Sequence, residues 1–176
     1  MIISKTQLKD AVLIDLEKIE DHRGFFARSW DVNIFKENGL NPKIVQCNIS
    51  YTKKKGTIRG MHYQKDPYAE AKLIRCTKGK ICDTIIDLRK TSETYKKWES
   101  FELSSSNFKM LYVPEGFAHG FQSLEDDTEI LYQVSQFYSP ECEKAIRWND
   151  PNFNINWPIK VTEISEKDNS IANFSE

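Results

Sequence analysis

The sequence lacks an excess of charge of either sign. Its 25 lysines and arginines nearly balance its 26 aspartates and glutamates, which leaves a formal net charge of -1 at pH 7. Binding to nucleic acid or to an anionic membrane surface usually depends on an excess of positive charge, so the composition predicts neither partner. A basic patch confined to one face is still compatible with this net charge.

Long hydrophobic runs are also absent. No stretch approaches the roughly 20 apolar residues that a membrane-spanning helix needs. Residues 1–20 have no long apolar run, and no basic start followed by a small-residue cleavage site, so we expect no signal peptide and a cytoplasmic protein. The cysteines Cys47, Cys76, Cys82 and Cys142 include no CxxC pair. We therefore expect reduced thiols that are buried as small apolar side chains.

Most of the chain consists of short apolar or alternating segments, separated by turn signals about every 8 to 12 residues. These segments are rich in Ile, Val, Tyr, Phe and Thr, as in KIVQCNISYT, AKLIRCTKG, KICDTIIDLR, KMLYVPEG and TEILYQVSQFY. The pattern predicts an all-β sandwich or barrel, as a single domain over residues 1–176. Residues 31–40 are the best helix candidate, with Gly39 as a stop signal. The segment after Trp157 loses the strand pattern, and we expect it to be irregular or helical and to pack on the outside.

Strand alternation suggests that the interior is not purely apolar. In KICDTIIDLR, Asp83 shares a face with Ile81 and Ile85, because alternate side chains of a strand point the same way. In TEILYQVSQFY, Tyr132 and Tyr138 share a face by the same argument. An interior that contains polar and aromatic groups is typical of a barrel with a ligand cavity.

Histidine is scarce, with only three in the chain. The segment PEGFAHGF contains PxGxxH, which resembles part of the second motif of the cupin superfamily, whose fold is a jelly roll. Metal-binding cupins also carry HxH and a glutamate in their first motif, but this chain has His62-Tyr63-Gln64 there, with Glu70 as the nearest carboxylate candidate. Histidine with glutamine is a poor ligand set for a transition metal. We therefore expect no metal, and keep a metal-dependent cupin enzyme as the alternative.

Without a metal, the polar candidates must perform organic chemistry or simple binding. They are His62, Lys72, His119, Tyr132, Arg59 and Arg23. A histidine can act as a base near neutral pH, a tyrosine can deliver a proton from another side, and a lysine can stabilise an oxyanion. These three functions are what proton exchange next to a carbonyl requires. Arginine suits phosphate, which it binds in bidentate fashion.

Seven segments resemble the dTDP-4-dehydrorhamnose 3,5-epimerase family of metal-free cupins and occur in the family's order. They are DHRGFF (21–26), QCNIS (46–50), GTIRGMHYQ (56–64), KLIRCTKGKICDTIIDLR (72–89), LYVPEGFAHGF (111–121), LYQVSQFYSPECEKAIRWNDP (131–151) and SEKD (165–168). The resemblance implies a cupin jelly-roll barrel with short flanking helices, no cofactor, and a homodimer. It also implies an enzyme of activated-sugar biosynthesis for surface polysaccharide, with a nucleoside-diphosphate 4-keto sugar as substrate.

The resemblance assigns four catalytic roles. His62 would remove a proton from C3 or C5, with Asp168 as the carboxylate that makes it a better base. Lys72 would stabilise the enolate oxygen. Tyr132 would return a proton from the opposite face and so invert the centre.

Further positions match residues that contact the ligand in the family. Arg59 and Arg23 would hold the diphosphate, and Tyr138 would stack on the nucleotide base. In a homodimer, Arg23 and Phe26 would reach into the partner's cavity. The remaining matches are Gln46, Asn48, His119, Glu143 and Lys167. Trp148 and Trp157 match no such role, and we expect them to be packing anchors.

Three positions depart from the family pattern. Arg28 stands where a ligand-contacting glutamate is usual, so it is expected at the site with reversed charge. Cys47 replaces a residue that is often acidic, and Glu70 stands where glutamine is frequent, so that Arg28 and Glu70 are candidates to compensate each other. These departures leave open the nucleotide (dTDP, GDP or CDP), the sugar, and inversion at C3, C5 or both.

Besides the metal-dependent cupin enzyme, two alternatives to an epimerase remain at this point. Ketoisomerases that shift the ketone between C3 and C4 occur among relatives, but they replace the tyrosine arrangement that Tyr132 preserves here. A non-catalytic sugar-nucleotide binder would have no need of a poised histidine, lysine and tyrosine together.

Overall fold

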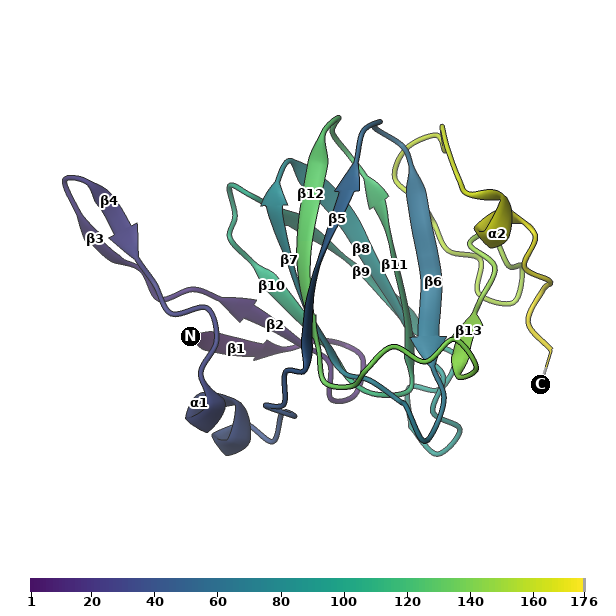
Figure 1. Cartoon of the computed structure of the whole chain (residues 1–176), viewed down its shortest axis with the longest axis horizontal. Coiled ribbons are helices and arrows are strands. Elements are labelled where there is room, and N and C mark those ends of the chain that lie inside the picture. The colour runs from purple at the N-terminus through teal and green to yellow at the C-terminus, as the bar shows by residue number, and fades with distance from the viewer. Residues whose placement is uncertain (176) are drawn as a thin grey trace.

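Two antiparallel sheets face each other in the computed structural model, which describes residues 1–175 (Figure 1). The six-stranded sheet has the order β1-β2-β10-β7-β12-β5, and the five-stranded sheet has the order β13-β6-β11-β8-β9. The first comprises β1 (Ile2–Lys5), β2 (Val12–Asp15), β10 (Met110–Val113), β7 (Lys72–Lys78), β12 (Thr128–Val134) and β5 (Gln46–Thr52). The second comprises β13 (Glu143–Ala145), β6 (Ile58–Gln64), β11 (Phe117–Ser123), β8 (Lys80–Asp87) and β9 (Trp98–Ser104). The predicted all-β class is confirmed.

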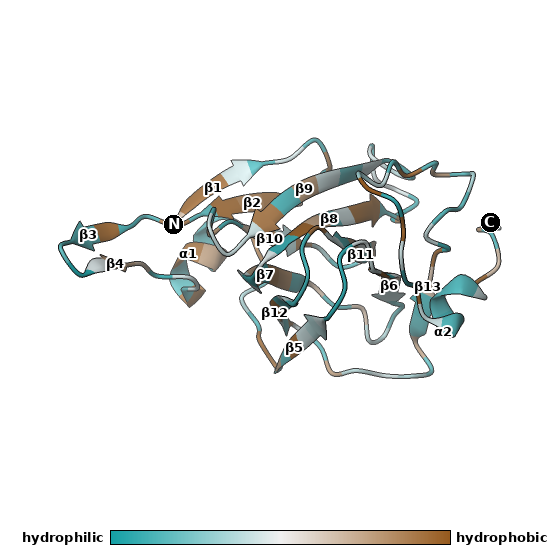
Figure 2. Ribbon diagram, turned by 90° about the horizontal axis from the view of Figure 1, so that it is seen from above, coloured by the Kyte–Doolittle hydropathy of each residue, from teal (hydrophilic) through white to brown (hydrophobic). Residues whose placement is uncertain are grey.

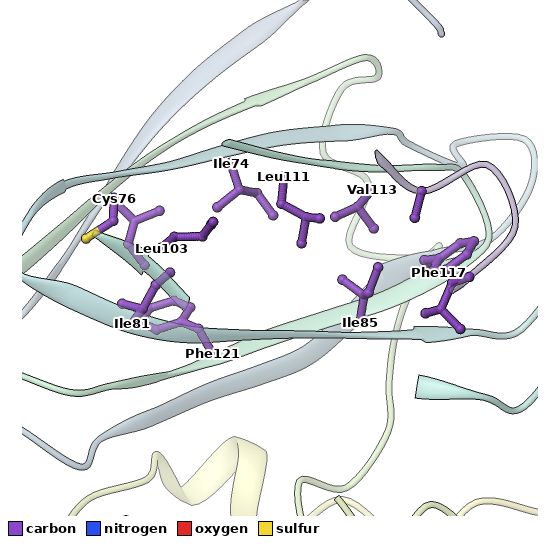
Figure 3. Close-up of a cluster of buried hydrophobic side chains, with 12 residues drawn as sticks. Ile74, Cys76, Ile81, Ile85, Leu103, Leu111, Val113, Phe117 and Phe121 are labelled. Atoms are coloured by element: carbon purple, nitrogen blue, oxygen red, sulfur yellow. The ribbon is translucent and has the colours of Figure 1, made fainter. Parts of the chain in front are cut away.

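Apolar side chains from both sheets fill one part of the space between them (Figure 3). Ile74 and Leu111 come from the six-stranded sheet, and Ile81, Ile85 and Leu103 come from the five-stranded sheet; all are 0% exposed. Burial of an aliphatic side chain of this size contributes roughly 1.5–3 kcal/mol to the free energy of unfolding. This packed cluster leaves the rest of the interior to the polar side chains described below.

The strands β6 and β11 approach each other unusually closely where two glycines meet. A Cβ atom added to Gly60 would lie 2.4 Å from the Cα of Gly120, and Gly60 has a φ of +129°, which L side chains rarely adopt. The register between the strands shifts at this point. As a result, His62 and His119 stand directly opposite each other on neighbouring strands.

The single helix predicted from residues 31–40 is α1 (Val32–Glu37). Asp31 caps it by accepting hydrogen bonds from the backbone amides of Asn33 and Ile34. Gly39 follows the helix with a φ of +70°, as expected of a glycine that ends a helix. The buried side chain of α1 is Phe35, which packs against Tyr112 of β10.

A short hairpin extends away from the two sheets, formed by β3 (Ile19–Asp21) and β4 (Gly24–Phe26) (Figures 1 and 2). Its apolar residues Ile19 and Phe26 are 71% and 66% exposed, although large apolar side chains are usually buried. The hairpin thus presents Ile19 and Phe26 as largely exposed apolar side chains in the described chain.

The C-terminal segment passes along β6 and contains α2 (Glu166–Asn169). Thr57 and Glu163 form a parallel bridge, and the amide of Ile58 donates to the carbonyl of Glu163 at 3.0 Å. The segment after Trp157 is irregular and then helical, as predicted. The expectation that it packs only on the outside is wrong, because residues 161–165 and Asp168 line the cavity described below. No helix in the described chain is long and apolar enough to cross a membrane.

The four cysteines are free, as predicted. Cys76 and Cys82 are buried, and burial raises the pKa of the Cys76 thiol to about 11. Cys47 is exposed and Cys142 is only partly buried, so the prediction that the cysteines are buried is wrong for these two. Cys47 is exposed because it lies on the outer side of β5, on the face opposite to Gln46 and Asn48.

Candidate functional site

A cavity of about 1290 Å³ is lined by both sheets and by the C-terminal segment. Strands β5, β7 and β12 contribute from one sheet, and β6, β11 and β13 contribute from the other. The predicted site residues that line it are Gln46, Asn48, Arg59, His62, Lys72, His119, Tyr132, Tyr138, Glu143 and Asp168. Residues far apart in the sequence therefore meet in one place, because the two sheets fold over each other.

His62 of β6 is paired with Asp168 of α2, as predicted. Its Nε2 atom lies 2.9 Å from Oδ1 of Asp168. Its Nδ1 atom is buried, lies 3.3 Å from Oε1 of Glu143 and has no hydrogen-bond partner in the described chain. Ser165 caps α2 by accepting a hydrogen bond from the amide of Asp168 at 3.1 Å. The cap and the packing of α2 on β6 thus hold the carboxylate against the imidazole.

Both carboxylates beside His62 are held in their charged form. Burial raises the pKa of Asp168, but the hydrogen bond and charge of His62 and the amide of Gly60 outweigh it, so the pKa lies below its ordinary value. Burial likewise raises the pKa of Glu143, and hydrogen bonds from Lys167 and Tyr138 lower it by more. The two carboxylates lie on the two ring nitrogens of His62 and fix the orientation of the ring.

Tyr132 reaches the cavity from β12, in the opposite sheet to His62. It is opposite Asn48 of β5 in the strand register, and the strict alternation of β12 points Ile130, Tyr132 and Val134 into the cavity. Burial raises the pKa of Tyr132, and the charge of Glu70 adds to the rise while Arg59 opposes it. The phenol is therefore protonated at neutral pH and can donate a proton.

Lys72 lies at the start of β7 with its side chain 9% exposed. Its Nζ atom is 3.2 Å from Oε1 of Glu70 and donates a hydrogen bond to the carbonyl of His62 at 3.3 Å. A cation is therefore present in the cavity, next to the strand that carries the histidine.

His119 of β11 forms a second histidine–carboxylate pair. Its Nε2 atom lies 2.9 Å from Oδ1 and 3.1 Å from Oδ2 of Asp83, which is 0% exposed. The sequence had placed Asp83 on one face of its strand with Ile81 and Ile85, and this face points inward. The pair sets a fixed imidazole beside His62 in the cavity wall.

Arg59 is held at the wall by hydrogen bonds to the Thr52 hydroxyl and the Tyr51 carbonyl. Gln46 accepts a hydrogen bond from the amide of Tyr138 at 2.9 Å. These contacts position a guanidinium and an exposed aromatic ring on the cavity lining.

Glu143 lines the cavity and contacts two side chains at its edge, Tyr138 and Lys167. Its Oε2 atom accepts hydrogen bonds from the Tyr138 hydroxyl at 3.0 Å and from Nζ of Lys167 at 2.8 Å. Lys167 itself does not line the cavity, and it meets the site only through Glu143. Tyr138 is 57% exposed, which leaves its ring free to contact a ligand.

Besides Lys167, three predicted ligand contacts lie outside this chain's cavity. Arg23 is on the β3–β4 hairpin and pairs with Asp21, and Phe26 on the same hairpin is exposed. Arg28 pairs with Asp31 at 3.2 Å. Their contact with a ligand stays a prediction for a partner's cavity.

The expected compensation between Arg28 and Glu70 is wrong within this chain. Arg28 forms an ion pair with Asp31, the N-cap residue of α1, and Glu70 forms an ion pair with Lys72. Arg28 and Glu70 are therefore each paired with a nearby side chain of opposite charge, and not with each other.

Several lining residues had no role in the sequence-based prediction. Residues 161–165 line the cavity because the segment pairs with Thr57, which no local pattern indicates. Trp157 packs in an apolar cluster as predicted, whereas Trp148 lines the cavity, so the packing prediction for Trp148 is incomplete. Its place within the matching segment 131–151 was the available signal.

The described residues contain no group of three or more histidine, cysteine, aspartate or glutamate side chains placed to hold a metal ion. The nearby carboxylates are instead engaged with His62, His119, Lys72 and Lys167.

Known proteins resemble this chain over nearly its whole length. The family model described as dTDP-4-dehydrorhamnose 3,5-epimerase matches residues 5–176. The dTDP-4-dehydrorhamnose 3,5-epimerase of Shigella flexneri is 41% identical over 169 residues, which cover 96% of this chain and 93% of that protein. The protein of the same name from Methanothermobacter thermautotrophicus is 41% identical over 167 residues, covering 93% and 89%.

Solved structures agree with this similarity. The dTDP-4-dehydrorhamnose 3,5-epimerase of Bacillus anthracis, with TDP and PPi bound, superposes with a TM-score of 0.94 at 39% identity and covers 98% of this chain and 99% of that chain. The enzyme from Elizabethkingia anophelis gives a TM-score of 0.96 at 40% identity, with 99% and 96% covered. The predicted cupin-type jelly roll is thereby confirmed.

Proposed function

Because this chain belongs to the dTDP-4-dehydrorhamnose 3,5-epimerase family, we propose that it is an isomerase that inverts C3 and C5 of a dTDP-linked 4-keto-6-deoxy sugar. One observation carries the chemical part of the proposal. A histidine paired with a buried carboxylate stands on one sheet, and a protonated tyrosine enters the same cavity from the other sheet. Removal and return of a proton on opposite faces of a carbon require groups on two sides.

The first step is proton removal. The C4 ketone makes the hydrogens on C3 and C5 acidic, because the electrons of the broken C–H bond can move onto the ketone oxygen. His62 takes the proton, and Asp168 at 2.9 Å orients the ring and stabilises its positive charge. The product of this step is an enolate with its negative charge on the C4 oxygen.

The second step is proton return. Lys72, with its ammonium in the cavity, stabilises the enolate oxygen. Tyr132 then donates its proton to the carbon from the other side, which inverts the centre and restores the ketone. His62 then releases its proton and Tyr132 regains one, both by exchange with solvent. A second round at the other carbon completes the double inversion.

The nucleotide is held by the remaining polar residues. Arg59 suits the diphosphate because a guanidinium donates parallel hydrogen bonds to phosphate oxygens. Tyr138 is the exposed ring for the nucleotide base, and the further ligand contacts are Gln46, Asn48, His119, Glu143 and Lys167. Relatives support this assignment, since solved structures contain TDP with PPi, dTDP-4-keto-L-rhamnose and dTDP-quinovose.

The working unit is a homodimer in this proposal. The exposed hairpin carries Arg23 and Phe26 away from their own cavity, and Arg28 follows it in the chain. Insertion of the hairpin into a partner would cover its apolar side chains and bring a second arginine to the diphosphate. We place the enzyme in the cytoplasm, where it supplies activated sugar for surface polysaccharide.

Proton exchange in D₂O tests the proposal. The purified protein is incubated with the 4-keto-6-deoxy sugar linked to dTDP, GDP or CDP, and NMR follows the C3 and C5 hydrogens, with His62→Asn as the control. We expect exchange at both carbons with the dTDP sugar, and none with the variant. Exchange at one carbon would restrict the enzyme to a single inversion, and no exchange with any nucleotide would overturn the proposal.

A further inference from the structure

Glu70 is a buried carboxylate in the cavity that the proposed mechanism leaves without a task. It lies in the loop before β7, lines the cavity and has a side chain only 12% exposed. Its partner is the ammonium of Lys72 at 3.2 Å, which is 9% exposed. Burial of an unpaired carboxylate is energetically unfavourable, so the cavity can hold Glu70 in its charged form only because Lys72 pairs with it.

Lys72 connects the two sheets through its ammonium. Its backbone belongs to β7 of the six-stranded sheet, while Nζ donates to the carbonyl of His62 on β6 of the other sheet at 3.3 Å. Glu70 binds the same ammonium from its own side of the cavity. A lysine has four rotatable side-chain bonds, and two acceptors on different elements restrict where its charge can lie.

We propose that Glu70 is a positioning residue that acts through Lys72 and holds the ammonium beside His62, where the enolate oxygen develops. This inference rests on the proposed epimerase function and deepens it. The carboxylate of Glu70 couples the position of the Lys72 ammonium to a charge, which a neutral acceptor could not do.

The same charge acts on Tyr132. Burial raises the pKa of Tyr132, the charge of Glu70 raises it further, and Arg59 lowers it. The other titratable or charged side chains that line this cavity are Lys72, His62, His119, Tyr63, Tyr138, Glu143, Glu163 and Asp168. Glu70 thus has a second consequence, because it extends to higher pH the range in which the phenol keeps the proton it must donate.

Two variants at one position separate these consequences. Glu70→Gln removes the charge and keeps an acceptor of nearly the same shape, whereas Glu70→Ala removes both. The matched control is Glu102→Gln, which removes the carboxylate of a Lys–Glu pair outside the cavity, 3.4 Å from Lys80. Steady-state kinetics and the pH dependence of kcat are measured for all four proteins with the dTDP sugar.

We expect kcat to fall about threefold to tenfold in Glu70→Gln and about 10- to 100-fold in Glu70→Ala, with KM within about threefold of wild type, because a displaced catalytic group impairs the reaction more than binding. The basic limb of the pH profile moves to lower pH in both Glu70 variants, and Glu102→Gln matches the wild type. The partial activity of Glu70→Gln is the rescue that positioning predicts.

Three results would overturn the inference. They are a kcat within twofold of wild type in both Glu70 variants, a rise in KM with kcat unchanged, or a basic limb that stays in place. An inactive wild-type protein would instead refute the underlying epimerase function. If Glu70→Ala does not fold, the kcat and the pH profile of Glu70→Gln alone still test the inference.

Discussion

Three basic side chains in this site are each paired with a carboxylate. His62 has Asp168, His119 has Asp83, and Lys72 has Glu70. Each partner restricts the side chain to one position before a substrate arrives, which lowers the reorganisation needed during reaction.

The His62–Asp168 pair predicts a specific loss of activity. Asp168→Asn keeps the size of the side chain but removes the charge that orients and stabilises the imidazolium. We expect kcat to fall by about 10²-fold or more while KM changes little. Steady-state kinetics with the dTDP sugar measure this, and activity within threefold of wild type would exclude the role of Asp168.

The same residue predicts a dependence of stability on pH. The folded protein holds the pKa of Asp168 below its ordinary value of 3.8. Its carboxylate therefore stabilises the fold at pH values above that ordinary value, and the contribution is lost as the pH falls through the lowered pKa. Urea unfolding of wild type and Asp168→Asn should show a difference at pH 7 that shrinks in strong acid. A difference that is the same at both pH values would contradict this.

At the scale of secondary-structure elements, the site depends on how closely β6 and β11 approach. Gly60 and Gly120 meet backbone to backbone, and the shifted register places His62 opposite His119. The arm formed by residues 161–168 then lies along β6 and brings Asp168 to His62. Both features concern strand β6, which makes it the element that organises the base.

Two glycines with almost the same backbone test this contact. Gly60 and Gly24 have φ values of +129° and +132°, but a Cβ at Gly24 meets nothing within 4 Å. Gly24→Ala should therefore cost only backbone strain, about 1–3 kcal/mol. Gly60→Ala adds a clash with Gly120 and should cost about 4 kcal/mol or more. Urea unfolding compares the two, and equal losses would show that the close approach does not matter.

The elements also show what a sequence can and cannot predict. Helix signals predicted α1, because capping and stop signals depend on local geometry. Alternation along the strand predicted only that Tyr132 and Tyr138 share a face, and it did not predict which face points into the cavity. Motif order placed His62 and Lys72 in one site. The pairing of Thr57 with Glu163 and the cavity position of Trp148 depend on contacts between distant segments, which no local pattern encodes. The suggested pairing of Arg28 with Glu70 is not found in this chain, because Arg28 pairs with Asp31 and Glu70 pairs with Lys72.

At the scale of the whole molecule, the hairpin is the part whose proposed function needs a second copy. It carries exposed apolar residues and Arg23 away from the two sheets (Figure 1). If each hairpin completes the partner's cavity, every active site contains residues from both chains.

Mixing two inactive variants tests this arrangement. The His62→Asn chain lacks the base in its own cavity. The Arg23→Glu chain lacks the arginine of the hairpin that it inserts into its partner's cavity. After the two are unfolded and refolded together, a mixed dimer contains one intact cavity, so roughly a quarter of wild-type activity should return. Each variant refolded alone is the control. No recovery, despite mixed dimers in native mass spectrometry, would contradict a shared site.

The most direct test of the central claim follows the fate of the proton in Tyr132→Phe. In D₂O, the wild type should incorporate deuterium at C3 and C5 with inversion. Because His62 still removes and returns a proton on its own side, Tyr132→Phe should incorporate deuterium from D₂O while it retains the original configuration. Inversion by Tyr132→Phe at the wild-type rate would contradict the claim that base and acid act from opposite sheets.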